Sequence, residues 1–299
     1  MGYLFVLLAA ALWGLLGPVS RFAFQAGVSP MEAAFWRAAM GGVLFGVHAA
    51  VRGRVRVARR DLPAVVAFGV AGVALFFAAY LRAVREGGAA LASVLLYTAP
   101  VWVALLSAVF LRERQGARKL LAMGVAMAGV AGIALTAGGG VRLSGAALFW
   151  GLLSGWAYAL YYVFGRRYFG RYEPATLFLY AYPVGALGLL PLVRFAHKTP
   201  VAWAALAFVA VVPTYGAYLA YGAGLRRVEA TRAATVATLE PVVASAAAYL
   251  LWGERLGAAG YAFAAVVVLG VALMVSGDGG KDAEAGTGEG ARGPPPDGG

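Results

Sequence analysis

Long apolar runs alternate with short polar joints along almost the whole chain. Each run holds about 20 residues, the length that a helix rising about 1.5 Å per residue needs to cross about 30 Å of hydrocarbon. The pattern therefore predicts an all-α membrane protein with ten transmembrane helices. The runs cover residues 3–24, 31–51, 62–83, 88–111, 117–137, 144–165, 174–195, 201–223, 230–252 and 257–276.

Composition indicates lipid rather than water as the main solvent. Of the 299 residues, 62% are hydrophobic and only 13% are charged, whereas soluble domains are about 45–50% apolar and about 25% charged. The net charge of +12 is spread over small basic clusters between the runs, so nucleic acid is not an expected partner. Residues 277–299 are rich in Gly, Pro and acidic side chains, which predicts a disordered cytoplasmic tail.

The basic residues also indicate the orientation of the chain. Most of them fall in joints that are cytoplasmic if the N-terminus is cytoplasmic, and the joint 52–60 alone holds five arginines. Cytoplasmic joints of membrane proteins carry an excess of Lys and Arg. Because ten is an even number of spans, both termini are expected in the cytoplasm, with the protein in the inner membrane of a bacterium or archaeon.

A repeat joins the two halves of the chain at an offset of 141 positions (232 minus 91). Residues 91–117 read LASVLLYTAPVWVALLSAVFLRERQGA, and residues 232–258 read RAATVATLEPVVASAAAYLLWGERLGA. Pro100 falls on Pro241, and an ER-x-GA motif follows each proline at the same distance. Self-similarity at a fixed offset is the signature of a repeated structural unit.

Five helices per half is an odd number, so the second half must enter the membrane the opposite way up. We expect an inverted repeat, with residues 1–137 as the first five-helix unit and residues 138–276 as the second. Transporters built from inverted repeats place their binding site near the middle of the bilayer, at the interface of the repeats.

The paired proline and ER-x-G motifs, together with a WG pair in the first run, resemble the EamA-type members of the drug/metabolite transporter superfamily. The resemblance extends over about residues 3–276. It implies a ten-helix exporter or permease of amino acids, metabolites or drugs, with a central cavity between the halves. It does not point to one substrate, one direction of transport, one coupling ion or one oligomeric state.

Charged residues inside a span are functional candidates, because ionised groups are costly in hydrocarbon. Glu240 lies deep in the ninth run, directly before Pro241. We expect it to bind a substrate ammonium group or a coupling proton. The alternative is a structural ion pair, for which Arg37 in the second run is a better partner than Arg232.

The two mid-span prolines are expected to shape the cavity. A proline removes one backbone donor and frees a carbonyl one turn earlier, and in a membrane such a defect is tolerated where it faces protein or water. Pro100 and Pro241 therefore predict kinks that line the cavity and flex during gating, or alternatively static packing kinks. Glu113 and Glu254, at the ends of the same runs, are expected to be interfacial caps or salt bridges between consecutive helices.

Aromatic side chains inside the spans complete the predicted substrate-binding cavity, together with the two charged and two proline positions above. Rings bind apolar and cationic groups well, although Trp and Tyr also gather at membrane interfaces. The aromatic candidates are Trp13, Tyr80, Tyr97, Trp156 and Tyr221.

The sequence contains no nucleotide-binding, metalloprotease or hydrolase motif, so enzyme activity, a metal site and a cofactor are not expected. It favours a secondary transporter, an exporter or permease of small amphipathic metabolites such as amino acids or drug-like compounds, that works by alternating access. The expected partners are a small-molecule substrate, the lipid bilayer and protons as the coupling ion. The alternatives are a membrane-embedded lipid-modifying enzyme, for which polar residues are few, and a channel or scramblase, which needs a continuous polar path.

Overall fold

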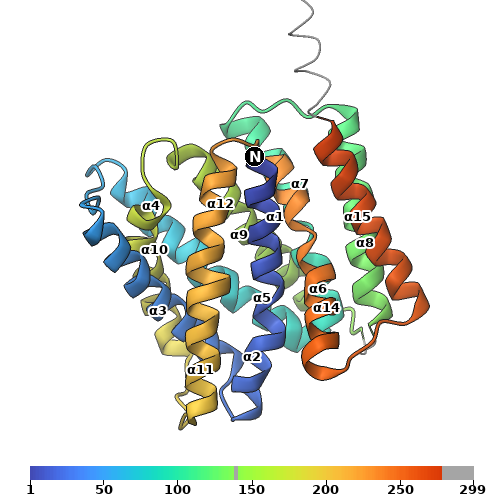
Figure 1. Cartoon of the computed structure of the whole chain (residues 1–299), viewed down its shortest axis with the longest axis horizontal. Coiled ribbons are helices and arrows are strands. Elements are labelled where there is room, and N and C mark those ends of the chain that lie inside the picture. Colours follow the sequence, from blue (N-terminus) through green and yellow to red (C-terminus); the bar gives the residue numbers. More distant parts are fainter. Residues whose placement is uncertain (138–140, 278–299) are drawn as a thin grey trace, which may run out of the picture.

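The computed structural model describes residues 1–137 and 141–277. Within these ranges the chain forms no strand, and ten helical segments are long and apolar enough to cross a membrane. The predicted fold class is therefore confirmed, and the segments differ from the predicted runs by only a few residues at their ends. Figure 1 shows them as one bundle of roughly upright helices. The predicted tail lies, from residue 278 onward, outside the described residues.

Several spans consist of more than one helix. The first half contains α1 (Gly2–Gly14) with α2 (Leu16–Gln25), α3 (Pro30–Val51), α4 (Leu62–Phe68) with the π-helical η1 (Gly69–Leu75) and α5 (Phe76–Gly87), α6 (Ala89–Leu96) with α7 (Ala99–Phe110), and α8 (Ala117–Thr136). The second half contains α9 (Gly145–Tyr168), α10 (Pro174–Leu189) with the 3₁₀-helical η2 (Leu190–Leu192), α11 (Pro200–Val209) with the π-helical η3 (Ala210–Gly216) and α12 (Ala217–Leu225), α13 (Ala230–Ala237) with α14 (Glu240–Trp252), and α15 (Ala258–Ser276).

From η1 and η3 onward, the two halves repeat element by element. Helices α6 and α13 begin at residues 89 and 230, η1 and η3 at 69 and 210, α7 and α14 at 99 and 240, and α8 and α15 at 117 and 258. The difference is 141 positions in every case (230 minus 89, for example), which is the offset of the sequence repeat. Because each half contains five spans, the halves have opposite orientations, as an inverted repeat requires.

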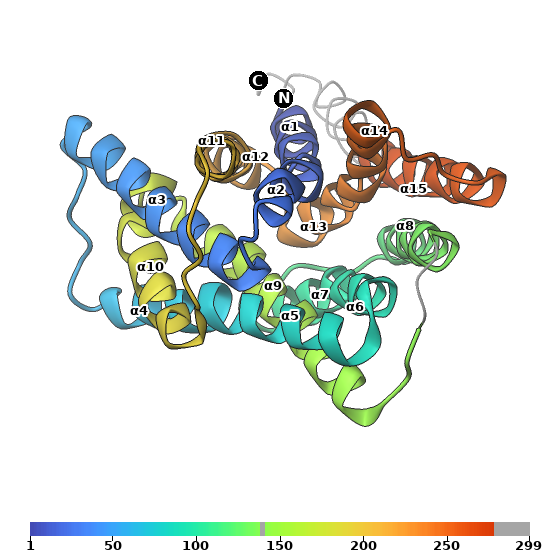
Figure 2. The same ribbon diagram turned by 90° about the horizontal axis from the view of Figure 1, so that it is seen from below.

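Helices of one half pack against helices of the other. The most extensive contacts join α8 to α15, α3 to α10, α5 to α9 and α1 to α12, and Figure 2 shows these pairs side by side along the bundle. The halves are therefore interlocked rather than separate. Met1 and the end of α15 lie at the same end of the bundle (Figure 1), which we call the Met1 end.

The fourth and ninth spans are interrupted at equivalent places. Two residues separate α6 from α7, and two separate α13 from α14. Pro100 and Pro241 lie in the first turn of the second helix of each pair, where a missing N–H leaves no hydrogen bond unmade. In each gap a threonine hydroxyl, of Thr98 and of Thr238, donates to the carbonyl three residues earlier, both at 2.6 Å. The structure thus differs from the predicted kinks, because each proline starts a new helix instead of bending a continuous one.

Candidate functional site

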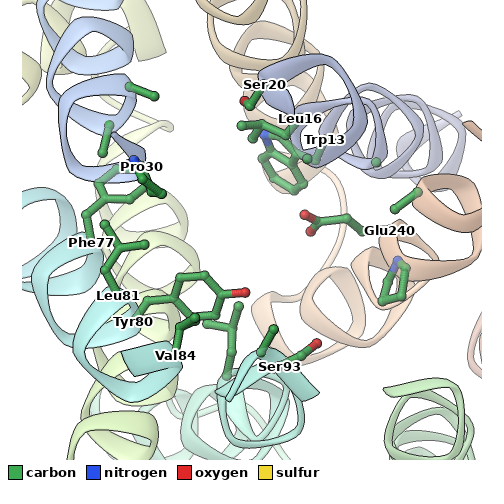
Figure 3. A pocket seen from close by; sticks show the side chains of 18 of the residues that line it. Trp13, Leu16, Ser20, Pro30, Phe77, Tyr80, Leu81, Val84, Ser93 and Glu240 are labelled. Atoms are coloured by element: carbon green, nitrogen blue, oxygen red, sulfur yellow. The ribbon is translucent and has the colours of Figure 1, made fainter. Parts of the chain in front are cut away.

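A cavity of about 560 Å³ lies at the interface of the two halves. Its walls come mainly from α1, α2, α3, α5 and α6 of the first half and from α14 of the second (Figure 3). The lining residues belong to the parts of these helices that are far from Met1, so the cavity runs from the end opposite Met1 to the middle of the spans. A mostly apolar hollow of this size with a few polar groups is typical of small-molecule sites.

Glu240 supplies the acidic group of this cavity. It is the first residue of α14, and its carboxylate points into the hollow, facing Tyr80 across it (Figure 3). The N-terminus of a helix carries partial positive charge, which favours a carboxylate at this position. The hydroxyl groups of Tyr97 and Tyr158 interact with it. Within the described ranges, Glu240 belongs to none of the ion pairs.

Arg37 supplies the basic group. It lies on α3, lines the same cavity, and is only 7% exposed. Its Nε donates a hydrogen bond to Thr214 Oγ1 at 2.8 Å, and its guanidinium carbon lies 5.1 Å from the ring centre of Phe77. Among the residues that the structure describes, no ion pair joins Arg37 to Glu240. The structure therefore forms no direct Arg37–Glu240 salt bridge, and both residues line the cavity.

Three of the predicted aromatic residues also line the cavity, namely Trp13, Tyr80 and Tyr97. The Trp13 ring packs against Tyr218 and Tyr221, with ring centroids 5.3 and 5.5 Å apart. Its indole Nε1 is buried and has no hydrogen-bond partner among the described residues. A buried donor without a partner is uncommon, and here it belongs to a residue that lines the cavity.

The other three predicted site residues lie elsewhere. Pro100 is buried in α7, outside the cavity lining. Tyr221 is fully buried, and its hydroxyl donates to the Tyr161 carbonyl at 2.8 Å. Trp156 lines a separate groove on the outside of α9. Pro100 and Tyr221 are the repeat counterparts of Pro241 and Tyr80, which do line the cavity, so each pair has one member inside it and one outside.

Sequence reasoning missed three residues at the site. Phe77 lies beneath the Arg37 guanidinium, Ser93 lines the wall of α6, and Thr214 fixes Arg37 from η3. Pro213 could have signalled the last of these, because it cannot donate to the carbonyl one turn earlier. That carbonyl, of Val209, instead accepts from the Thr214 hydroxyl at 2.8 Å.

The Met1 end of the interface is closed by polar contacts that the joint after α7 and the start of α8 make with the start of α13. The Glu113 carboxylate is 7% exposed and accepts from the backbone N–H of Ala230 at 2.8 Å and of Thr231 at 3.4 Å, which caps α13. Beside it, Lys119 Nζ donates to Glu229 Oε2 at 2.6 Å. Glu113 is thus a cap, as predicted in kind, but its partner is a helix of the other half and not the next helix.

Glu254, the repeat counterpart of Glu113, has a different environment. It pairs with Arg21 of α2 at the end opposite Met1, and both side chains are about half exposed. The backbone groups that would correspond to the Glu113 cap belong to Ala89 and Ala90, at the start of α6. Ala89 instead lines the open cavity. The two equivalent caps are therefore formed at one end of the bundle and not at the other.

An inverted five-helix repeat with a cavity at its interface is the architecture of a secondary transporter. A model of the EamA-like transporter family matches residues 1–135 and 145–276. The chain belongs to this family and is a multi-pass membrane transporter.

Individual relatives and one solved structure agree with this assignment. A transporter of Archaeoglobus fulgidus is 29% identical over 272 residues, which are 90% of this chain and 96% of that protein. A probable terminal-alkyne amino-acid exporter of Streptantibioticus cattleyicolor is 29% identical over 73% of this chain and 74% of its own length. A crystal structure matches with a TM-score of 0.79 at 19% identity, covering 91% of this chain and 95% of that one, and supports the fold.

Proposed function

We propose that the protein exports small amphipathic metabolites, zwitterionic amino acids among them, across the inner membrane by alternating access. The observation that carries this proposal is the pair of opposite charges in one aromatic cavity. Arg37 and Glu240 both line it, and neither neutralises the other in an ion pair among the described residues.

A zwitterion complements this arrangement group by group. Its carboxylate would bind the Arg37 guanidinium, which suits carboxylates because of its planar array of donors. Its ammonium group would bind the Glu240 carboxylate and the faces of Tyr80 and Tyr97, which attract cations. The volume of about 560 Å³ leaves room for an apolar side chain.

In the proposed orientation the cavity is open to the outer face, as the release step of export requires. Most joints rich in arginine lie on one side, and the positive-inside rule then places both termini in the cytoplasm. The cavity opens at the end opposite Met1, which would be the outer face. A substrate taken up from the cytoplasm would leave through this opening after the Met1 end had closed. We assign the coupling ion as a proton carried by the Glu240 carboxylate, which would exchange with the substrate ammonium group.

Alternating access would exchange the two caps of the inverted repeat. In the state described here, Glu113 holds the start of α13 and closes the Met1 end. In the opposite state, Glu254 would leave Arg21, hold the start of α6 at Ala89 and Ala90, and close the outer end. The symmetry of the repeat supports this exchange, because a pseudo-two-fold axis in the membrane plane relates the two halves, and one half moves against the other during alternating access.

Counterflow in proteoliposomes tests the proposed substrate class. We expect saturable exchange of at least one zwitterionic amino acid. Exchange of N-acetylated analogues, which have no ammonium group, should not depend on Glu240. Exchange of amino-acid amides, which have no carboxylate, should not depend on Arg37. Flux that does not saturate would contradict a carrier, and failure of every amino acid to exchange would contradict this substrate class.

Two variants and a control test the residues. Glu240→Gln is expected to lower exchange of zwitterions at least about tenfold, the effect of losing about 1.4 kcal/mol from a charged contact. Arg37→Gln should have a similar effect. Glu86→Gln removes a carboxylate outside the cavity lining at the same end of the bundle, and should leave exchange unchanged. A folded Glu240→Gln protein with unchanged rate and pH profile would show that Glu240 neither binds substrate nor couples transport.

A further inference from the structure

A second hollow lies on the lipid-facing side of the bundle, separate from the substrate cavity. It is a groove of about 980 Å³ between α4 and the end of α7, with α9 as its floor. One wall is shallow because it carries the small side chains of Ala64, Ala67 and Ala71. The floor is formed by Trp156 and Leu160. An open apolar groove of this shape matches an acyl chain.

The end of the groove nearest the Met1 end is strongly basic. Arg112 and Arg167 line it, and both also line an adjoining polar hollow of about 590 Å³ that contains Arg114 and Arg166. In the part of the chain that the structure describes, neither Arg112 nor Arg167 has an ion pair or a side-chain hydrogen bond. The groove therefore ends in unneutralised positive charge.

The acidic residues beside these arginines are engaged with other groups. Glu113 caps the start of α13 and lies 3.9 Å from Arg166 Nε. Glu229 accepts from Lys119 at 2.6 Å and from Arg232 at 3.0 Å. They leave the charge of the groove end available to an anion from outside the protein.

The backbone at Arg112 gives an independent reason to expect a ligand. Its φ is 56°, and within the described ranges no other residue except glycine has a positive φ. Its repeat counterpart is Gly253, with φ 68°, so the left-handed turn belongs to the repeated frame and glycine suits it. Arginine in the same turn is strained, and such strain is retained chiefly at functional positions.

We propose that this groove binds one anionic phospholipid, with an acyl chain along α9 and the phosphate between Arg112 and Arg167. Opposite charge selects the headgroup, and the apolar walls select a lipid over a free anion. In the orientation given above, the basic end lies at the cytoplasmic surface, where negatively charged headgroups attract Lys and Arg. The site is independent of the substrate cavity and of the transported compound.

Tryptophan quenching by lipids with brominated acyl chains tests the proposal on the full-length protein. Quenching by a lipid in the groove is measured as the difference in quenching between the parent protein and the Trp156→Phe variant. We expect brominated phosphatidylglycerol to produce this signal at a mole fraction about 5- to 30-fold lower than brominated phosphatidylcholine, given two arginine contacts. Inorganic phosphate should not displace the lipid.

Variants separate lipid binding from folding. Arg112→Gly places glycine in the turn, as in the repeat counterpart, so this variant should have a higher unfolding temperature in lipid-free detergent. The double variant Arg112→Gly/Arg167→Gln should lose the preference for phosphatidylglycerol. The double variant Arg59→Gln/Arg60→Gln, in the joint at the same membrane face, should keep the preference. Equal quenching by the two lipids, a preference that survives in the Arg112→Gly/Arg167→Gln protein, or displacement by phosphate would overturn the proposal.

Discussion

Truncating Glu113 is expected to favour opening at the Met1 end of the bundle. The carboxylate accepts from two backbone N–H groups at the start of α13, of Ala230 and Thr231, and from the Thr231 hydroxyl at 3.3 Å. Glu113→Ala removes all three acceptor contacts. The Thr231 hydroxyl keeps Ser107 as a partner at 2.9 Å, so this hydroxyl is not left unsatisfied.

The size of the effect follows from these contacts. Loss of a helix cap costs about 1 kcal/mol. Loss of a carboxylate from a helix N-terminus costs a further amount of roughly 0.3–1 kcal/mol. The closed Met1 end should therefore lose about 1–2 kcal/mol, which changes the ratio of the two states by about 5- to 30-fold. Glu254→Ala should act in the opposite direction, because its present partner, Arg21, forms only an exposed pair, and exposed pairs contribute little.

The absence of cysteine makes the assay direct. Ser93 lines the open cavity, and its repeat counterpart Ala234 is 3% exposed at the closed end. In Ala234→Cys protein, the rate of maleimide labelling measures how often the Met1 end opens. Adding Glu113→Ala should raise this rate about 5- to 30-fold. In Ser93→Cys protein, adding Glu113→Ala should slow labelling of the cysteine, whereas adding Glu254→Ala should not slow it.

The result that refutes the reasoning is equally specific. The exchange of caps is wrong if Glu113→Ala leaves labelling at position 234 unchanged, or if Glu254→Ala raises it. Combining both substitutions should return the labelling rate toward that of the parent protein, since each removes one of two opposed contacts. General loosening of the fold would instead raise labelling at both positions 93 and 234.

Two further predictions concern single hydrogen-bonded groups. Thr214→Val removes the acceptor of Arg37 Nε, and should raise the KM for zwitterions about fivefold, the effect of about 1 kcal/mol, while Thr214→Ser restores it; a proteoliposome titration measures both. The hydrogen bond from Tyr172 at 2.7 Å, with that from Arg171 at 2.8 Å, holds the pKa of Asp61 below its usual value near 3.9. The resulting stabilisation is present above about pH 5 and lost as the pH falls below about 4, so Asp61→Asn should make the unfolding temperature in detergent less sensitive to pH between about 5 and 3.

The overall fold was predictable because hydrocarbon imposes one rule on every span. Twenty apolar residues form a helix almost regardless of which apolar residues they are, so the runs could be read without knowledge of their contacts. The repeat was predictable for a related reason. Pro100 and Pro241 mark the same interruption in both halves, and proline constrains the backbone wherever it occurs.

The site was only partly predictable, because side-chain partners depend on packing between distant spans. Glu240 and Arg37 attract notice as charges inside apolar runs, and both line the cavity. The contact of Arg37 with Thr214 depends on a π-helical turn whose position the apolar pattern does not reveal. Tyr221 has the same residue type and repeat position as Tyr80, yet only Tyr80 lines the cavity, because the two ends of the repeat are in different states.

The distribution of repeated and unrepeated residues follows from where each acts. A contact that closes an end of the bundle serves one state only, so a transporter with two ends needs a copy at each, which is the role that we propose for Glu113 and Glu254. A binding group must serve both states, and one copy suffices if it lies where the two access paths meet. Glu240 lies at the interruption in the middle of the ninth span, and its counterpart is Ala99. The acid therefore breaks the symmetry of the repeat at the one depth where symmetry is not required.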